Sequence, residues 1–367
     1  MFSYNIKGKN ATETHPWLID FESKIIRGEA CLRAALELKK SGFTPDIIIA
    51  HPGWGENLFV KEVWPNSKLG IYCEFFYATN GRDVGFDPEF PIEDITNKCR
   101  TNLKNINNLL NFHIADGGIS PTFWQASTFP EPFRSHITVA HDGIDTDVIK
   151  PNQNVKISIN NNIHLCKTDE LITFVSRNLE PYRGFHSFMR SLPTILKNRT
   201  KARILIVGGE EVGYGEGPPQ GQTWKNKYIE ELQSTTKRSD WDRIHFLGNI
   251  PYDQFIAILQ ISTVHIYLTY PFVLSWSLLE AMSAGCAIVA SDTAPVKEAV
   301  KDHETGLLVN FFDVEDIAMT VCELLRNSDK RRTLASAARD FARTNYDLNT
   351  ICLPKQLEWV NSLSEIR

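Results

Sequence analysis

Short aliphatic runs alternate with longer amphipathic stretches along most of the chain. In the second half six such runs, each followed by a turn or a helical stretch, end at Ser176, Gly209, Gly248, Leu268, Ser291 and Val309. In the first half four runs end at His51, Phe75, Ser120 and Gly143. Strands that alternate with helices are typical of parallel sheets covered by helices. The pattern therefore predicts an α/β protein.

A weakly periodic segment divides the chain into two halves. It reads KPNQNVKISINNNIHLCKTDE, and its asparagine and lysine content is typical of irregular surface chain. With 367 residues, 42% of them hydrophobic, the chain is long enough for two domains. We predict an N-terminal domain over residues 1–150, a second domain over 151–345, and a C-terminal helix within 346–367 that packs back toward the first domain.

The first half opens with a helical stretch and not with a strand. The segment HPWLIDFESKIIRGEACLRAALELKKSGFTPD carries helix-ending signals at Gly42 and Pro45. A doubly wound domain normally begins with a central strand and a glycine turn. Two explanations stay open at this stage: the first sheet is built without that strand, or the sequence starts downstream of where related sequences start.

Net charge, cysteine content and the length of the apolar runs exclude some classes of protein. A formal net charge of -5 argues against a nucleic-acid partner. The seven cysteines are scattered and odd in number, which suits free thiols in a reducing compartment. Because no run reaches the roughly 18 apolar residues of a membrane span, we expect a cytoplasmic protein, and any membrane contact to be local, peripheral and at the inner face.

Two arginines flank the end of a predicted strand and the start of a predicted helix. In LITFVSRNLEPYRGFHSFMRSLPTIL the strand ends at Ser176 and the helix opens near Gly184. Arg177 and Arg183 lie between them, where free N–H groups, the helix dipole and two guanidinium groups predict an anion site for a phosphate or diphosphate. We favour this site over a pair of solvated arginines because ligands of open α/β sheets bind beyond the carboxyl ends of strands.

One acid stands in an otherwise uncharged stretch. From Val264 to Val296 the only formal charges are Glu280 and Asp292, and neither face of the helical segment LSWSLLEAMSAG looks solvated. The pattern predicts a helix covered on most sides, whose carboxylate needs hydrogen-bond donors. Ribose hydroxyls are suitable donors, so we predict that Glu280 binds the ribose of a nucleotide. The alternative is an acid whose partners are groups of the protein itself.

Two further motifs give weaker signals. The loop GGEEVGYGEGPPQGQ, residues 208–222, follows a strand but does not lead directly into a helix, as a dinucleotide fingerprint does. We interpret it as a flexible rim, with Gly208 lining the ligand site. Asp145 and Asp147 in GIDTDV are spaced to hold a divalent metal, but turns favour aspartate for local backbone hydrogen bonds. We therefore expect no metal site there.

In the first half His51 and Glu74 each lie at the end of a predicted strand. His51 leads into HPGWGE, and aromatic residues flank Glu74 at Tyr72, Phe75, Phe76 and Tyr77. Strand-end acids and histidines are candidates for acid, base or hydroxyl-binding roles. Aromatic rings beside a carboxylate suit the apolar faces and hydroxyls of a sugar, and they suit a hydrophobic core as well. We take both residues, with the two arginines, as candidate catalytic residues.

Four segments of the second half carry a combined signature: VSRNLEPYRGFHSFMRSLPTIL, ARILIVGG, IHFLGNIPYDQF and LLEAMSAGCAIVASDTAPVKEAVKDHETGLLV. Together they resemble the donor domain of family-4 glycosyltransferases of the GT-B fold, and HDGIDTDVIKP resembles the turn that leads into that domain. In the first half HPWLIDFESKIIRGEA through CEFFY looks like a bacterial subgroup concerned with surface polysaccharide. Members of that subgroup begin earlier, with a strand and a glycine loop, so the N-terminal domain is expected to lack its first strand.

The resemblance implies roles for particular residues. In the family an arginine and a lysine near the first helix of the second domain bind the donor diphosphate, and Arg177 and Arg183 fall on these positions. The family glutamate that binds the donor ribose corresponds to Glu280. We also take Gly208, at the end of its strand, and Asn249, in a matched segment, as donor contacts. The family glycines whose backbone N–H groups meet sugar and phosphate are replaced by other residues, and we expect the N–H groups of these to make the same contacts: Val273, Leu274 and Ser275.

Phe272 departs from the family pattern. An earlier glutamate of the family usually contacts the transferred sugar, and in this sequence that position is Phe272. The donor sugar is therefore left open.

The resemblance as a whole implies two Rossmann-like domains that face each other across a cleft. It implies retaining transfer of a sugar from a nucleotide-sugar donor to a glycan or lipid-linked acceptor, without a metal or a further cofactor. Two alternatives stay open: a sugar-nucleotide epimerase on the same fold, and a donor-binding protein without transfer activity.

Overall fold

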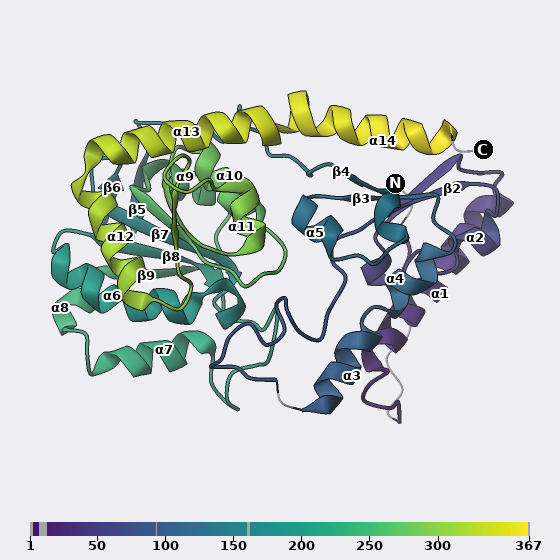
Figure 1. Cartoon of the computed structure of the whole chain (residues 1–367), viewed down its shortest axis with the longest axis horizontal. Helices are drawn as coiled ribbons and strands as arrows, with labels where there is room; N and C mark the ends of the chain where they lie inside the picture. The colour runs from purple at the N-terminus through teal and green to yellow at the C-terminus, as the bar shows by residue number, and fades with distance from the viewer. Residues whose placement is uncertain (1–2, 7–12, 93, 160–161, 366–367) are drawn as a thin grey trace. The chain divides into compact units, whose positions relative to one another are not determined.

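The computed structural model describes residues 3–6, 13–92, 94–159 and 162–365. The chain folds as two compact units (Figure 1). Unit 1 comprises Met1–Asp142 together with Cys352–Arg367, and unit 2 comprises Gly143–Ile351. The chain therefore passes from one unit to the other twice.

Unit 2 is built on a six-stranded parallel sheet with the strand order β12-β11-β10-β7-β8-β9. All six strands predicted from the second half are present. Their bounds are β7 Leu171–Asn178, β8 Arg203–Gly209, β9 Ile244–Gly248, β10 Val264–Tyr267, β11 Ala287–Ser291 and β12 Leu307–Val309. The prediction of an α/β fold is confirmed.

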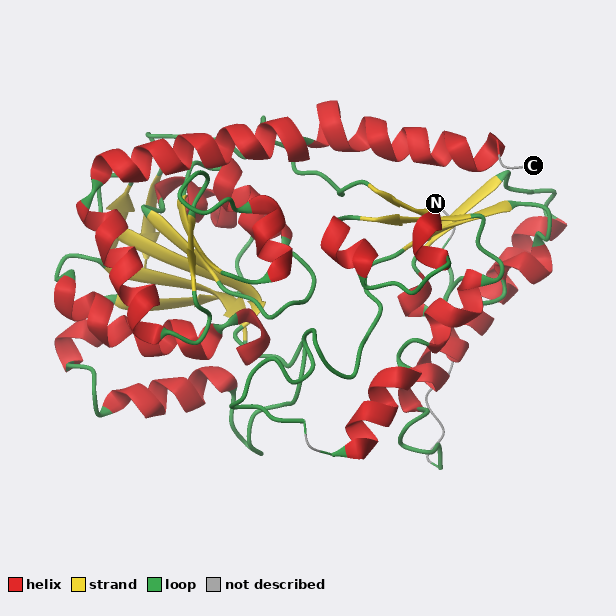
Figure 2. Ribbon diagram, viewed as in Figure 1, coloured by secondary structure: helices red, strands yellow, loops and turns green. Residues whose placement is uncertain are grey.

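Helices cover both faces of this sheet (Figure 2). On one face α6 packs through Phe188, whose ring stacks on Phe174 of β7 at 4.4 Å. On the other face apolar side chains of α9, α10 and α13 form one buried cluster with those of β10 and β11. The helices of unit 2 are α6 Phe185–Asn198, α7 Trp224–Gln233, α8 Arg238–Trp241, α9 Tyr252–Ile261, α10 Trp276–Ser283, α11 Ala294–Ala299, α12 Val314–Arg326 and α13 Ser328–Tyr346.

The strand order reverses in the middle of the sheet. From β7 the chain adds β8 and β9 on one side, and it then returns to add β10, β11 and β12 on the other side. In open α/β sheets such a reversal separates the loops that follow the two central strands, and ligands bind in the crevice that this leaves. The loops after β7 and β10 are therefore the expected place of a ligand site.

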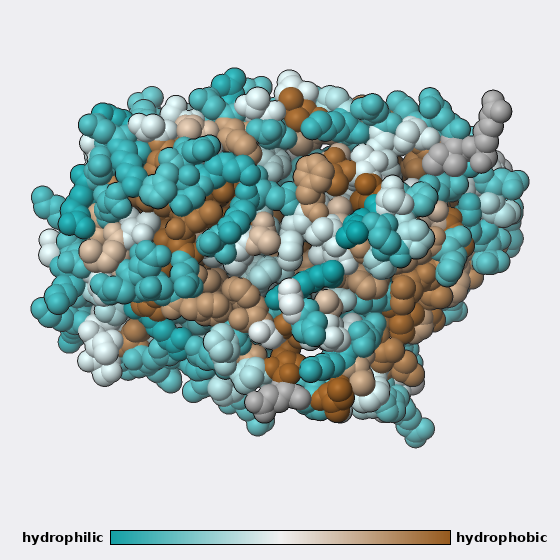
Figure 3. All heavy atoms as spheres, in the orientation of Figure 1, coloured by the Kyte–Doolittle hydropathy of each residue, from teal (hydrophilic) through white to brown (hydrophobic). Residues whose placement is uncertain are grey.

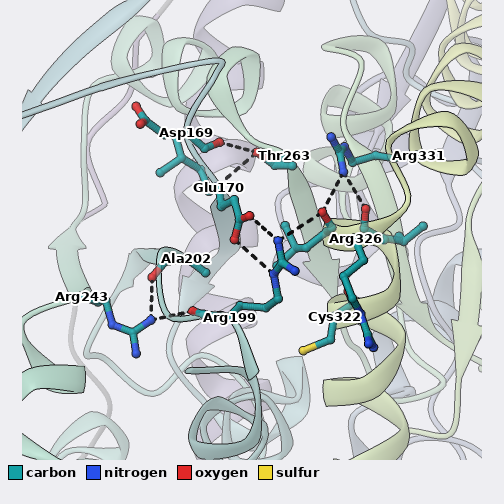
Figure 4. A network of polar contacts seen from close by, with 12 residues as sticks. Asp169, Glu170, Arg199, Ala202, Arg243, Thr263, Cys322, Arg326 and Arg331 are labelled. Atoms are coloured by element: carbon teal, nitrogen blue, oxygen red, sulfur yellow. Dashed lines mark hydrogen bonds and ion pairs between the residues drawn. The ribbon is translucent and has the colours of Figure 1, made fainter. Parts of the chain in front are cut away.

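A polar network fixes the opposite, amino-terminal edge of the sheet (Figure 4). Arg199, which follows α6, forms an ion pair with Glu170, which precedes β7. Arg243, which precedes β9, donates to the carbonyls of Arg199 at 2.8 Å and Ala202 at 3.1 Å. Thr263, just before β10, donates to the carbonyl of Asp169 at 2.8 Å. These contacts hold the starts of neighbouring strands together. They take no part at the carboxyl ends of the strands, where the loops begin.

The segment predicted to be irregular surface chain contains a β-hairpin, so that prediction is wrong. β5 (Lys156–Ile159) pairs antiparallel with β6 (Ile163–Cys166). The two strands alternate polar and apolar residues, and their apolar residues pack in one buried cluster with Leu205, Ile258 and Ile261. The asparagines obscured the short alternation of polar and apolar residues in these strands. The apolar residues find a surface to pack against only in the folded unit.

Unit 1 carries a four-stranded parallel sheet with the order β1-β2-β3-β4. The four strands predicted from the first half are present as β1 Ile47–Ala50, β2 Lys68–Tyr72, β3 Gly117–Ser120 and β4 Ile137–Val139. The predicted opening helix is α1 Ile19–Lys40, and the remaining helices are α2 Val60–Val63, α3 Ile95–Leu103, α4 Ile106–Phe112, α5 Phe123–Ser127 and α14 Leu353–Glu365. Within the described residues no helix combines the length and apolar composition needed to cross a bilayer.

The last helix, α14, packs on the sheet of unit 1. Trp359 and Leu363 are buried with Ile119 and Ala140. The close approach depends on Gly70 in β2, where an added Cβ would lie 2.7 Å from both Leu363 Cδ1 and Trp359 Cη2.

We expect Gly70→Ala to destabilise unit 1 by about 1–3 kcal/mol, the usual cost of overpacking a buried contact. Urea denaturation measures this change. Gly217→Ala is the matched control, because an added Cβ there has its nearest neighbour at an ordinary 3.6 Å. Equal stability of the two variants would show that α14 does not press on β2.

Candidate functional site

The loops after β7 and β10 bring the predicted donor residues of unit 2 to one edge of the sheet. After β7 the chain makes a single turn, Pro181–Arg183, before α6 begins. Gly184 closes this turn with φ +67°, and an added Cβ would lie 2.3 Å from Leu268 Cβ after β10. Only glycine tolerates both this left-handed conformation and the close approach of Leu268. Gly184 therefore lets the turn that carries Arg183 lie beside the β10 loop.

Arg183 is held in place by one end of its guanidinium group. Its side chain is buried, and Nη1 donates to Thr269 Oγ1 at 3.0 Å and to the carbonyl of Val273 at 3.1 Å. The other guanidinium nitrogens, Nε and Nη2, donate no hydrogen bond to any residue that the structure describes. A buried guanidinium with unused donors suits an anionic ligand.

The loop before α10 adds further unused donors. Val273 and Leu274 are buried, and across the described ranges their backbone N–H groups donate no hydrogen bond. Ser275 differs from its two neighbours, because its N–H donates to the hydroxyl of Tyr267 at 2.8 Å. Of the three predicted backbone donors, two are therefore available at the N-terminus of α10, and Ser275 acts instead as the helix cap through its side chain.

Arg177 and Arg183 differ in exposure. Arg177, near the end of β7, is exposed and pairs with no side chain in the part of the chain that the structure describes. Between the two arginines lies Glu180, which is only 1% exposed. Burial raises the pKa of Glu180, and N–H donors and the two arginines oppose that effect. Sequence reasoning missed Glu180, although a lone acid between two arginines is a visible signal.

Glu280 lies on α10, where six of the eight residues are buried, as predicted for a covered helix. Its Oε1 accepts a hydrogen bond from the hydroxyl of Tyr252, at the start of α9, at 2.6 Å. Burial raises the pKa of Glu280, and the Tyr252 bond opposes this. Tyr252 is 56% exposed, so the pair extends from the interior to solvent. Sequence reasoning did not find Tyr252.

Gly208 and Asn249 lie at the ends of β8 and β9. An added Cβ on Gly208 would lie 2.7 Å from the carbonyl of Ser176. Asn249 is exposed, and its Nδ2 would lie 3.0 Å from a Cβ on Gly209. Gly208 is therefore required by strand packing, and Asn249 lies at the rim of the same edge.

Phe272, where the resemblance implied an acid, is 4% exposed and belongs to an aromatic cluster. Its ring lies edge-on to Tyr214 at 4.9 Å and to Tyr182 at 5.7 Å. Tyr182 also packs on Tyr270 at 4.6 Å. A wall of rings therefore stands beside Arg183 in place of a carboxylate.

In unit 1 the structure brings His51 and Glu74 together at the carboxyl ends of β1 and β2. His51 Nε2 lies 3.4 Å from Glu74 Oε2, and His51 Nδ1 accepts from Gly53 N at 3.1 Å. The imidazole lies between two rings, Trp54 at 4.7 Å and Tyr72 at 5.5 Å. A backbone donor at Nδ1 leaves the Nε2 proton for Glu74, which orients the pair.

The two acids of GIDTDV form a turn. Asp145 Oδ1 accepts from the N–H groups of Asp147 at 3.1 Å and Val148 at 3.0 Å. These bonds match the local role expected for aspartate in turns. Among the residues described, no three His, Cys, Asp or Glu side chains gather as a metal site would require.

Comparison with known families agrees with this arrangement. Residues 157–341 match the family described as glycosyl transferases group 1, and residues 1–149 match the family described as glycosyl transferase family 4 group. The first of these matches covers half of the chain. The chain belongs to the group 1 glycosyltransferases.

Curated proteins that the chain matches include distant ones. A protein of Mycobacterium tuberculosis named GDP-mannose-dependent alpha-(1-6)-phosphatidylinositol monomannoside mannosyltransferase is 24% identical over 303 residues, which are 78% of this chain and 69% of that protein. The chain spans about half the length of several other curated relatives that it matches.

Solved structures confirm the GT-B fold. Sucrose-phosphate synthase from Thermosynechococcus elongatus matches with a TM-score of 0.71 and 17% identity, over 94% of this chain and 79% of that chain. HepE from Anabaena, solved in complex with UDP-glucose, matches with a TM-score of 0.65 and 16% identity, over 92% and 84%. At such identities the likeness shows the fold alone.

The buried acid Glu280 gives a pH-dependent prediction. The pKa of Glu280 is higher in the folded protein than in the unfolded chain. Glu280 therefore contributes to the stability of the fold at pH values below its pKa in the unfolded chain, and this contribution is lost as the pH rises through its pKa in the folded protein. Glu280→Gln does not titrate, so its melting temperature should exceed that of the wild type at pH 8 by about 2–4 °C, the shift that about 1 kcal/mol produces in a domain of this size.

Thermal unfolding without ligand between pH 5 and pH 8 measures this difference, which should shrink toward pH 5. The exposed Glu211→Gln serves as the control. A difference that grows as pH falls would contradict the sign of the shift.

Proposed function

We propose that the protein transfers a sugar, with retention of anomeric configuration, from a nucleotide-sugar donor to a glycan or lipid-linked acceptor. The observation that carries this proposal is the cluster of unused, buried donors at the carboxyl edge of unit 2. Arg183 Nε and Nη2 and the N–H groups of Val273 and Leu274 converge there from the β7 and β10 loops. Such a group of donors suits a diphosphate.

In this proposal each donor residue has a defined task. Arg177 and Arg183 bind the diphosphate, and Glu280 accepts from the ribose hydroxyls, with Tyr252 holding one carboxylate oxygen in place. As the bond from the sugar to the phosphate breaks, negative charge develops on the leaving diphosphate. Arg183 and the two N–H groups are fixed before the reaction, so they stabilise that charge without reorganisation.

The transfer step needs no group beyond donor and acceptor. A bond forms between the acceptor oxygen and the anomeric carbon, the bond from that carbon to the diphosphate oxygen breaks, and the leaving phosphate takes the acceptor proton. We propose that this step proceeds without a metal, because the arginines and N–H groups carry the charge stabilisation.

For the acceptor we propose the His51–Glu74 pair of unit 1. Exposed Trp54 stacks on His51, and a ring beside a carboxylate suits a sugar with both apolar faces and hydroxyls. Unit 1 also exposes large apolar side chains, among them Ile95 and Phe123, and Figure 3 shows apolar residues among the polar ones on this unit. These side chains favour an acceptor with a lipid part and a peripheral membrane contact.

Binding and product analysis test the proposal directly. Calorimetry with UDP, GDP and ADP should give binding by at least one of them, and incubation of the matching nucleotide sugars with candidate acceptors should release that nucleoside diphosphate. NMR of the product reads the anomeric configuration. The absence of binding for all three nucleotides would remove the assignment of the donor site, and binding without product would favour a donor-binding protein.

Glu280→Gln should raise the dissociation constant of the nucleoside diphosphate about tenfold, because a charged ribose acceptor becomes neutral. Arg183→Ala should lower turnover about 100-fold, the usual cost of removing one preorganised donor. Steady-state kinetics and calorimetry separate the two effects, with Arg238→Ala, an exposed arginine of the same unit, as control. A wild-type dissociation constant in Glu280→Gln together with wild-type turnover in Arg183→Ala would disprove the proposed donor site.

Glu74→Gln should lower turnover about 100-fold, because the acceptor hydroxyl that Glu74 orients would be misplaced for transfer. The dissociation constant for the nucleoside diphosphate should stay unchanged, because Glu74 belongs to unit 1 and the donor residues to unit 2. Glu62→Gln, at another exposed acid of unit 1, is the control. An equal loss of turnover in Glu74→Gln and Glu62→Gln would indicate a general effect of removing a negative charge from unit 1.

A further inference from the structure

The loop of residues 210–222 connects β8 to α7 and is exposed along most of its length. Tyr214 is an exception, because it is partly buried while the residues on either side are exposed. The glycine and proline content of this loop led us to expect only a flexible rim. The structure instead fixes one of its side chains at the candidate donor site.

The ring of Tyr214 lies directly against the site. It faces the guanidinium carbon of Arg183 at 5.3 Å from the ring centroid. It also lies edge-on to Phe272 at 4.9 Å and packs on Tyr182 at 5.9 Å. Tyr214 therefore covers the same arginine whose remaining donors are unused, and it joins the aromatic wall that stands where the resemblance implied a sugar-binding acid.

A buried carboxylate holds the backbone on which this ring stands. Glu180 Oε2 accepts from the N–H of Gly213 at 3.0 Å and from the N–H of Tyr214 at 2.8 Å. No other side chain among the described residues bonds to these two N–H groups. The loop is thus attached to the turn between β7 and α6, the turn that also carries Arg183.

Glycines on both sides of Tyr214 make this attachment possible. An added Cβ on Gly213 would lie 2.9 Å from Glu180 Oε1, and one on Gly215, with φ +72°, would lie 2.9 Å from the ring of Tyr182. Both positions therefore need glycine for close approach, and Gly215 needs it for its backbone conformation as well.

A loop that only connects a strand to a helix needs none of these features. Water satisfies N–H groups in an exposed loop, whereas burying a carboxylate costs free energy unless it is fully hydrogen-bonded. The protein nevertheless buries Glu180 to fix two residues of a loop that is otherwise exposed. The consequence of that arrangement is the position of the Tyr214 ring over Arg183.

We propose that Tyr214 is a donor-contacting residue, whose ring closes over the diphosphate beside Arg183, and that Glu180 is the residue that positions it. This inference rests on the proposed donor site. With the donor bound, the ring excludes water from the sugar–phosphate bond and strengthens the contacts of Arg183, because a less polar surrounding screens charge less. Glu180 acts only through the loop.

A double-mutant cycle measured by calorimetry tests the coupling. The probe is UDP, GDP or ADP, whichever the wild type binds most tightly. Tyr214→Ala should raise its dissociation constant about tenfold, Glu180→Ala should raise it by the same factor, and the double variant should be no weaker than either single one. Tyr214→Phe keeps the ring and should bind like the wild type.

Two controls separate positioning from a loss of stability. Glu180→Gln keeps one carbonyl acceptor for the loop and should restore most of the affinity lost in Glu180→Ala. Glu211→Ala, an exposed acid of the same loop, should leave the dissociation constant unchanged. Additive losses in the double variant, or a Tyr214→Phe variant as weak as Tyr214→Ala, would overturn the inference.

Protease Glu-C, which cleaves after glutamate, gives a readout independent of affinity. The loop offers Glu216, and the nucleoside diphosphate should slow cleavage there in the wild type but not in Glu180→Ala. A wild type that binds none of the three nucleotides overturns the proposed function together with this inference. Wild-type binding with an unchanged constant in Tyr214→Ala overturns this inference alone.

Discussion

The arrangement of the proposed donor site depends on the pairing of β7 with β10. These two strands lie side by side in the six-stranded sheet although Val264 and its register partner Ile172 are 92 positions apart in the sequence. Because all strands are parallel, both loops leave the sheet at the same edge. That single constraint places Arg183, after β7, against the loop that leads from β10 into α10. The amino-terminal edge carries ion pairs and carbonyl contacts that hold the strands together, so these contacts and the proposed donor site lie on opposite edges of the sheet.

At the carboxyl edge Arg183 links the two loops. One end of its guanidinium group bonds Thr269 and the carbonyl of Val273, which fixes the β10 loop to the β7 turn. The other end is left with unused donors beside two buried N–H groups. The hydrogen bonds of Arg183 go to neutral acceptors only, and its unused donors favour an anionic ligand. The same turn carries Glu180, so the loop after β8 is tied to it as well.

Much of this could be predicted from the sequence because the signals are local. Aliphatic runs that alternate with helical stretches located all ten strands of the two large sheets, and the isolated charge in an apolar stretch identified Glu280. Arg177 and Arg183 were found because they lie near the end of a predicted strand and before a helix, although the structure extends β7 past the predicted end at Ser176 and so includes Arg177. The hairpin of β5 and β6 was missed, since its alternation spans only a few residues and its apolar face needs the surface of unit 2. In unit 1 the sequence singled out His51 and Glu74 separately, and their approach to 3.4 Å follows from the pairing of β1 with β2.

The sequence by itself therefore determined the class of fold, the approximate positions of the strands and which charged residues stand near their carboxyl ends, because these depend on neighbours within one turn or one strand. The tertiary structure decided which donors stay unused. The N–H of Ser275 donates to the hydroxyl of Tyr267 and is therefore not available to a ligand. Glu280 accepts from Tyr252, which lies 28 positions away in the sequence, and Glu180 accepts from the N–H of Tyr214 in the loop after β8. These partners lie in other elements, and whether a polar atom is satisfied or free is a property of the whole packed unit.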